Sequence, residues 1–147
     1  MVDRVTISSN KRNVDSLYTL LLNALSELDK CSESLRLSVS GIRGLKPGER
    51  NFLVYIPKRG KWRRISRELK KLCLAYGNPS TFLVVIKYSY YGENGRKHAL
   101  HGDYFLLNLE YHSNSIELKV KHLRGLLRTS ESYILEKITN ILKTKCR

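Results

Sequence analysis

The sequence predicts an α+β fold in which helices flank an antiparallel sheet of four to five strands. Three observations support this prediction. Apolar residues recur at helical spacing near both ends of the chain, several middle segments alternate between apolar and polar residues, and hairpin-type turn signals separate those segments. The chain has 147 residues, of which 41% are hydrophobic, so it suits one domain with one hydrophobic core.

The first elements are an extended segment, a helix and a strand. The segment 4–8 reads RVTIS, and residues 13–30 then carry apolar groups at helical spacing with Asn13 as the N-cap. Residues 35–40 alternate between Leu or Val and polar side chains. That alternation predicts a strand with one face in water.

A loop, two strand segments and a second helix follow. Residues 43–50 contain Gly and Pro and are expected to form a loop, whereas 51–56 read as a strand that turns into residues 61–65. The next helix begins near Ser66. It should end at Gly77, because Gly favours the position just past a helix C-terminus and Pro79 follows.

The segment 81–91 reads as a long strand, and Asn94-Gly95 after it is typical of a two-residue hairpin turn. Counting from that turn pairs Tyr91 with His98 and Val84 with Phe105. Gly102 is expected to introduce a bulge that shifts the register by one residue.

A second hairpin turns near Asn114-Ser115. With those residues at its centre, Glu110 faces Lys119, whereas another register would place Glu110 opposite Glu117. Charge pairing favours the first register.

The last helix should span residues 130–144, capped by Thr129 or Ser130. It divides the chain into a domain of residues 1–128 and a C-terminal helix of residues 129–147. Its apolar seam either packs on the sheet or zips against a partner helix to form a homodimer or higher oligomer. The seam consists of Leu127, Ile134, Ile138 and Ile141.

The charge of the chain is strongly positive and concentrated in its middle. There are 27 Lys and Arg against 13 Asp and Glu, a net charge of +14, and the segment from Arg43 to Lys71 holds eleven cations and two Glu. Such a cluster indicates a polyanion partner whose binding weakens steeply with salt. The residues expected to contact phosphates are Arg59, Lys61, Arg63, Arg64, Arg67, Lys70 and Lys71.

Aromatic residues accompany these cations on predicted strands, among them Tyr104. Rings on a sheet surface beside cations are suited to stacking on unpaired bases, whereas a duplex hides its base faces. The sequence has no helix-turn-helix or zinc-finger spacing that would indicate recognition of base edges in the grooves of duplex DNA. A single strand is therefore the preferred partner. The residues expected to stack on bases are Tyr55, Trp62, Tyr88, Tyr90 and Tyr91.

Three stretches, RNFLVYIPKRGKWRRISRELKKL, YSYYGENGRK and SYILEKITNILK, give the chain a layout similar to the crenarchaeal single-stranded-DNA-binding family called ThermoDBP. The resemblance covers nearly the whole chain in layout and composition. It implies helices around an antiparallel sheet, a basic cleft with an apolar and aromatic floor, and a C-terminal helix that dimerises. It also implies sequence-tolerant binding in DNA replication or repair without catalysis.

The sequence is also compatible with other functions. RNA is an alternative to DNA, since contacts to a 2′-hydroxyl cannot be read from composition. A metal-dependent nuclease is another, with Asp103, Glu117 and Lys119 in a D…ExK pattern. His98 and His101 with Asp103 are weak candidate metal ligands, because the two histidines alternate across a strand. A structural subunit whose basic face binds an acidic protein is a third class.

We expect no cofactor and no membrane partner. The longest apolar run, FLVVI, is too short to span a bilayer, and no signal-peptide pattern opens the chain. We therefore expect a soluble protein. Three widely spaced cysteines without a CxxC motif favour a reducing compartment, and hence the cytoplasm. The absence of Gln mildly favours an archaeal source from a hot environment.

Overall fold

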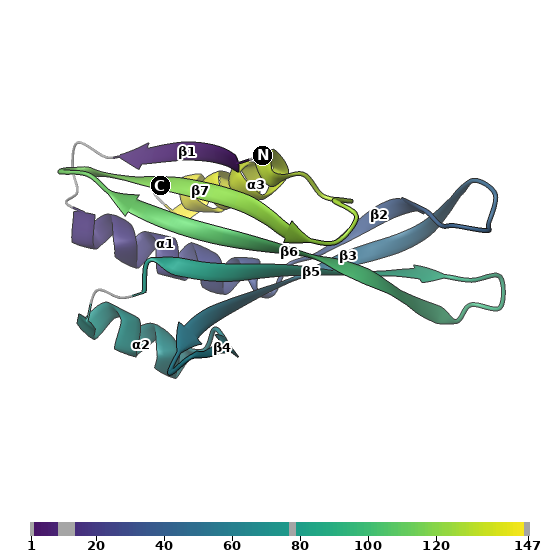
Figure 1. The fold of residues 1–147 in the computed structure, drawn as a ribbon, viewed down its shortest axis with the longest axis horizontal. Coiled ribbons are helices and arrows are strands. Elements are labelled where there is room, and N and C mark those ends of the chain that lie inside the picture. The colour runs from purple at the N-terminus through teal and green to yellow at the C-terminus, as the bar shows by residue number, and fades with distance from the viewer. Residues whose placement is uncertain (1, 9–13, 77–78, 146–147) are drawn as a thin grey trace.

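The computed structural model describes residues 2–8, 14–76 and 79–145, and these ranges contain three helices and seven strands (Figure 1). Asn13 and Gly77, the expected boundary residues of two helices, lie outside the described residues. In chain order the elements are β1 (Val2–Ser8), α1 (Val14–Leu28), β2 (Ser32–Ser38), β3 (Leu45–Lys58), β4 (Lys61–Arg64), α2 (Arg67–Tyr76), β5 (Thr81–Tyr91), β6 (Lys97–Tyr111), β7 (Ser115–Arg124) and α3 (Glu131–Lys145).

The α+β class and the C-terminal helix are confirmed, but the sheet has more strands than the expected four to five. All seven described strands join one antiparallel sheet: six follow the order β1-β7-β6-β5-β3-β2, and β4 lies off this path, paired with β3. The extra strands are short edge pieces. β1, the opening segment, pairs with β7. β2 pairs with the first half of β3, and β4 pairs with the last residues of β3 on the same side.

Both long helices lie on one face of the sheet, behind it in Figure 1, and they contact each other. Every second side chain of a strand points toward these helices, because successive side chains in a strand point to opposite faces. The core between sheet and helices is closed by large side chains with at most 1% exposure, including Phe52, Phe82, Phe105, Leu21, Leu25, Ile134 and Ile138. The other face of the sheet carries neither α1 nor α3. In the described ranges no helix is both long and apolar enough to cross a membrane.

Serine side chains start two of the helices as expected. The Ser66 hydroxyl accepts a hydrogen bond from the backbone N–H of Leu69 at 3.2 Å. The Ser130 hydroxyl accepts one from the N–H of Tyr133 at 3.1 Å. Each bond satisfies a donor that the first helical turn leaves unpaired. Of the two candidates, Thr129 and Ser130, it is therefore Ser130 that caps the N-terminus of α3.

The predicted loop at 43–50 is wrong, because β3 already begins at Leu45 and pairs with β2 through residues 45–51. Its glycine has a packing role. A Cβ on Gly48 would lie 2.4 Å from the carbonyl oxygen of Ser89 on the neighbouring β5. Gly48 therefore lets two backbones approach closely inside the sheet instead of ending a strand.

The bulge lies at Gly102 as expected, and the β5–β6 register agrees with the prediction on the side of the bulge away from the turn. Between the bulge and the turn the prediction is wrong by one residue: His98 pairs with Tyr90 instead of Tyr91, and the N–H of Gly92 donates to the carbonyl oxygen of Arg96, so the connection is longer than a two-residue turn. Val84 pairs with Phe105, and the register then shifts by one residue after Ile86, so that His101 and Gly102 together oppose Lys87. A Cβ on Gly102 would lie 2.5 Å from the carbonyl oxygen of Ile86. The bulge therefore requires glycine at this position.

The predicted register of the second hairpin is wrong. Glu110 pairs with Glu117, not with Lys119, although the Lys119 ammonium still forms an ion pair with Glu110. It also lies 3.7 Å from Glu117. A long lysine side chain reaches a diagonal neighbour, and a shift of two residues keeps the same side chains in the core. Charge pairing could not distinguish the two registers for this reason.

The C-terminal seam is internal, which corrects its interpretation as a zipper between two copies. Ile134 and Ile138 are fully buried against the sheet and α1, and Ile141 is half-buried against the same core. Leu127 lies before α3 and does not share its apolar face. A side chain already buried in its own fold is not available to a partner helix.

Replacing Ile138 with alanine should lower the free energy of unfolding by about 2–5 kcal/mol, because it leaves a cavity in the core. Asn140→Ala on the exposed side of α3 is the matched control and should change it by less than about 0.5 kcal/mol. Urea denaturation measures both. An Ile138→Ala protein of unchanged stability that sediments as a smaller species would instead identify a zipper.

Candidate nucleic-acid interface

The structure gathers the seven predicted phosphate-binding residues on one local unit. They come from the β3–β4 turn, from β4 and from α2, and all but half-buried Lys70 are exposed. Two have partners within the protein: Arg64 forms an ion pair with Asp29, and Lys70 donates a hydrogen bond to the Asn23 side chain at 3.0 Å. The remaining five, Arg59, Lys61, Arg63, Arg67 and Lys71, form no ion pair with a described side chain.

Strand β4 presents cations to both sides of the sheet edge. Its residue Trp62 pairs with Pro57 and Arg64 pairs with Tyr55, so the two side chains point to the face that lacks α1 and α3. Lys61 and Arg63 point to the other side by alternation. Trp62 is 43% exposed at this edge, where its ring borders the helix-free face.

The helix-free face, here called the open face, carries rings and cations in rows across the strands. Tyr55 of β3 pairs with Leu83 of β5, which pairs with Leu106 of β6. The same row ends at Lys121 of β7. The neighbouring row consists of Leu53, Val85, Tyr104 and Arg124.

Tyr104 and Arg124 form a pair that the expected site did not include. The guanidinium carbon of Arg124 lies 5.7 Å from the centre of the Tyr104 ring. Exposed Lys87 and Lys121 flank the pair on adjacent strands. Tyr104 stood out in the sequence, but choosing it required the register between β6 and β7, because only the register places its ring beside cations on the open face.

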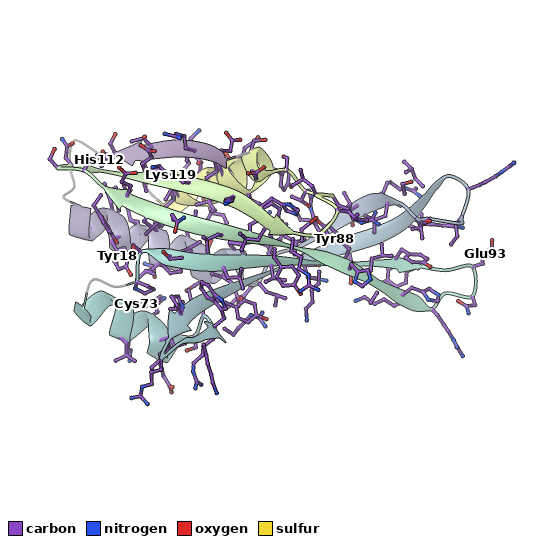
Figure 2. The ribbon with its side chains drawn as sticks, viewed as in Figure 1. Tyr18, Cys73, Tyr88, Glu93, His112 and Lys119 are labelled. Atoms are coloured by element: carbon purple, nitrogen blue, oxygen red, sulfur yellow. The ribbon has the colours of Figure 1, made fainter. Side chains whose placement is uncertain are left out.

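Tyr88 is not on the surface, which corrects its expected role in base stacking. It is 2% exposed, and Figure 2 places it near the middle of the sheet. Its hydroxyl donates to Asp103 at 2.6 Å and lies 2.7 Å from the Thr129 hydroxyl. Burial, together with the hydrogen bond to Asp103, raises the pKa of Tyr88 well above its usual range. The ring is part of the core.

Tyr90 and Tyr91 lie far from the cationic edge. Tyr90 is half-buried and stacks on His98 with ring centres 5.0 Å apart, and Tyr91 is exposed. On β3 the partner of Tyr90 is Gly48 and the partner of Trp62 is Pro57, so nine residues separate the two places, roughly 30 Å. Figure 2 shows the tip of this hairpin, at Glu93, at the opposite end of the molecule from Cys73 on α2. The expected aromatic residues therefore do not form one site.

Asp103 is a fully buried carboxylate that accepts four hydrogen bonds. The donors are the Tyr88 hydroxyl, the His122 ring at 2.9 Å, and the backbone N–H groups of Leu127 and Arg128 at 2.7 and 2.8 Å. Burial acts to raise the pKa of Asp103, but the four hydrogen bonds together lower it below its usual value. Asp103 therefore fixes the chain between β7 and α3.

The candidate nuclease constellation is not assembled. Asp103 is seven residues along β6 from Glu110, the partner of Glu117, a separation of roughly 24 Å. Lys119 pairs with Asn108 and forms ion pairs with Glu110 and Glu117. His98 stacks on Tyr90, and the described residues contain no group of three side chains placed to hold a metal ion.

Comparison with known proteins gives no family. No model of a known protein family matches the chain, and no curated protein matches it. Among solved structures, TTHA0849 from Thermus thermophilus is 12% identical, with a TM-score of 0.33 over 100% of this chain and 99% of that one. Ara h 8.0201 is 14% identical, with a TM-score of 0.25 over 97% and 94% of the two chains. At these values neither likeness bears on the function.

Replacing Asp103 with asparagine should destabilise the protein by roughly 3 kcal/mol at pH 7, because an amide cannot accept from all four donors. The lowered pKa sets the pH dependence. The carboxylate stabilises the fold fully above the ordinary Asp pKa of about 3.9, and this contribution is lost as the pH falls through the folded-state pKa. The difference between wild type and variant should therefore shrink below about pH 4.

Urea denaturation from pH 7 to pH 3 measures that difference, with exposed Glu93→Gln as the control. A stability difference that stays constant over the whole pH range would show that the Asp103 charge does not stabilise the fold.

Proposed function

We propose that this protein binds single-stranded nucleic acid, preferably DNA, along the open face of its sheet, without catalysis. The strand passes around the β4 edge, from the side on which Lys61, Arg63 and α2 lie onto the open face, and crosses Tyr55 and Tyr104 toward Lys121 and Arg124. A cytoplasmic role in DNA replication or repair follows from this activity as part of the proposal.

One observation carries the proposal: cations without an ion-pair partner among the described side chains lie at the edge of a sheet face that has rings and carries neither α1 nor α3. Five cations of the β3–β4 turn, β4 and α2 form no ion pair with a described side chain. Like charges brought together without a partner repel one another, and phosphates relieve that repulsion. Rings beside the cations offer a surface on which bases stack.

The arrangement favours an unpaired strand over a duplex. Tyr55 and Tyr104 are half-buried on the sheet, so only a base with an accessible face can lie against them. In a duplex those faces are stacked on one another, and the duplex would gain only backbone contacts from the same surface. From β4 to β7 the open face spans four strand spacings, about 19 Å. A short run of nucleotides fits across it, which supports sequence-tolerant binding.

Replacing Lys61 and Arg63 together with alanine should weaken binding to all single-stranded sequences alike. Two phosphate contacts are lost, so the slope of log affinity against log salt should fall by about 1.4. Fluorescence titration of labelled oligonucleotides at several salt concentrations measures this change. The matched control replaces Arg43 and Arg96, two exposed cations at the hairpin tips, and should leave the slope nearly unchanged. Equal losses in both double variants would place binding outside the β4–α2 edge.

Replacing Tyr104 with alanine should cost about 1–3 kcal/mol of binding free energy, with little change in the salt slope, because it removes a stacking surface and no charge. Tyr91→Ala is the matched control, since this exposed tyrosine lies at the far end of β5. We expect it to bind like wild type. A larger loss for Tyr91→Ala than for Tyr104→Ala would move the site to the hairpin tip, and tighter binding of duplex would overturn the preference for single strands.

A further inference from the structure

The loop that joins β7 to α3, residues 125–130, exposes an apolar cluster that the proposed function does not use. Leu126 is 73% exposed, Leu123 at the end of β7 is 50% exposed and Leu127 is 47% exposed. Single exposed leucines are ordinary on protein surfaces. Three of them within five residues, on one short loop and the strand end before it, form a patch.

This loop is held in one conformation. The buried Asp103 carboxylate accepts the backbone N–H groups of Leu127 and Arg128 at 2.7 and 2.8 Å. The Arg128 guanidinium in turn donates to the backbone carbonyl of Ser38, at the end of β2, at 2.9 Å. The exposed leucines therefore project from a fixed backbone.

Leu127 has a backbone conformation that leucine disfavours. Its φ angle is +56°, in the left-handed region where a Cβ causes steric strain and glycine is preferred. The side chain recovers little through packing, because about half of it remains exposed. Folding alone would favour glycine at this position. The presence of leucine in a strained, fixed and exposed position indicates that its side chain serves a contact outside the chain.

The charges around the patch are positive. Exposed Lys121 lies just before the leucines in the chain, exposed Arg124 lies between them, and half-buried Arg128 follows them. The acidic residues packed near the loop, Asp103 and Glu131, are buried and engaged in hydrogen bonds, so they place no negative charge on the surface. A partner that covers the leucines must therefore contact the cations at the border of the patch.

We propose that the Leu123–Leu126–Leu127 patch is a docking site for an acidic protein segment that carries an apolar anchor. The anchor covers the leucines, and flanking Asp or Glu residues meet Lys121 and Arg124, for which the segment competes with the nucleic-acid strand. A second copy of this chain is disfavoured, because the same cations would face each other across a symmetric contact. A fixed loop with a strained leucine suits a shaped protein surface, whereas a fluid bilayer does not require a fixed loop.

The test uses random linear peptides displayed on phage and selected against the full chain. We expect enriched peptides to carry an apolar residue flanked by Asp or Glu. The selected peptides should bind the Leu126→Ser and Leu127→Gly variants about tenfold or more weakly than wild type, as measured with synthetic peptides by fluorescence anisotropy. Leu45→Ser, at an exposed leucine of the β2–β3 hairpin, is the matched control and should bind like wild type.

A thermal melt separates this role from a structural one. Leu127→Gly should have a melting temperature equal to or above that of wild type, because it relieves the backbone strain. A clear decrease would assign the leucine to folding and overturn the proposal. Peptides that bind the loop variants as well as wild type, or an enriched set without acidic residues, would also overturn it. So would a dimer in sedimentation, or binding to phosphatidylglycerol vesicles, that Leu126→Ser abolishes.

Discussion

The fold depends on the fact that its two long helices cover only one face of the sheet. α1 and α3 pack against the same side, and the rings of Phe52, Phe82 and Phe105 fill the space between. Apolar side chains that alternate along the strands are buried by this layer, and the second set of alternating side chains is left on the open face. That division decides which aromatic residues can meet a ligand. Tyr88 belongs to the buried set, and Tyr55 and Tyr104 belong to the open one.

Strand β4 connects the cationic segment to the open face. It pairs with the last residues of β3, so Trp62 and Arg64 border Tyr55 while Lys61 and Arg63 project from the other side of the edge. The basic segment of the sequence is thus neither a loose tag nor one helix face. It forms one edge of the sheet, and its cations lie on β4 and on α2.

Much of the fold was predictable because local patterns determine it. Alternation identified the strands, and Gly102 located the bulge. What could not be predicted depends on long-range pairing. Core burial does not distinguish the Glu110–Glu117 register from the predicted Glu110–Lys119 register, because a shift of two residues keeps the same side chains in the core. Tyr88, Tyr90 and Tyr91 looked equivalent in the sequence, and only the position of each along the sheet relative to α3 separates a core ring from an exposed one. Tyr104 needed the β6–β7 register to be seen beside Arg124.

Mapping where a single strand binds tests most directly whether the open face is the binding surface. Nuclear magnetic resonance of the labelled protein, titrated with an oligothymidylate, reports which backbone amides change their environment. Binding along the open face should perturb signals on β4 and at Tyr55, Leu83, Leu106 and Tyr104, and should leave those of Tyr91 and α3 unchanged. Perturbations confined to α3 or to the hairpin tips, with β4 and the open face silent, would contradict it.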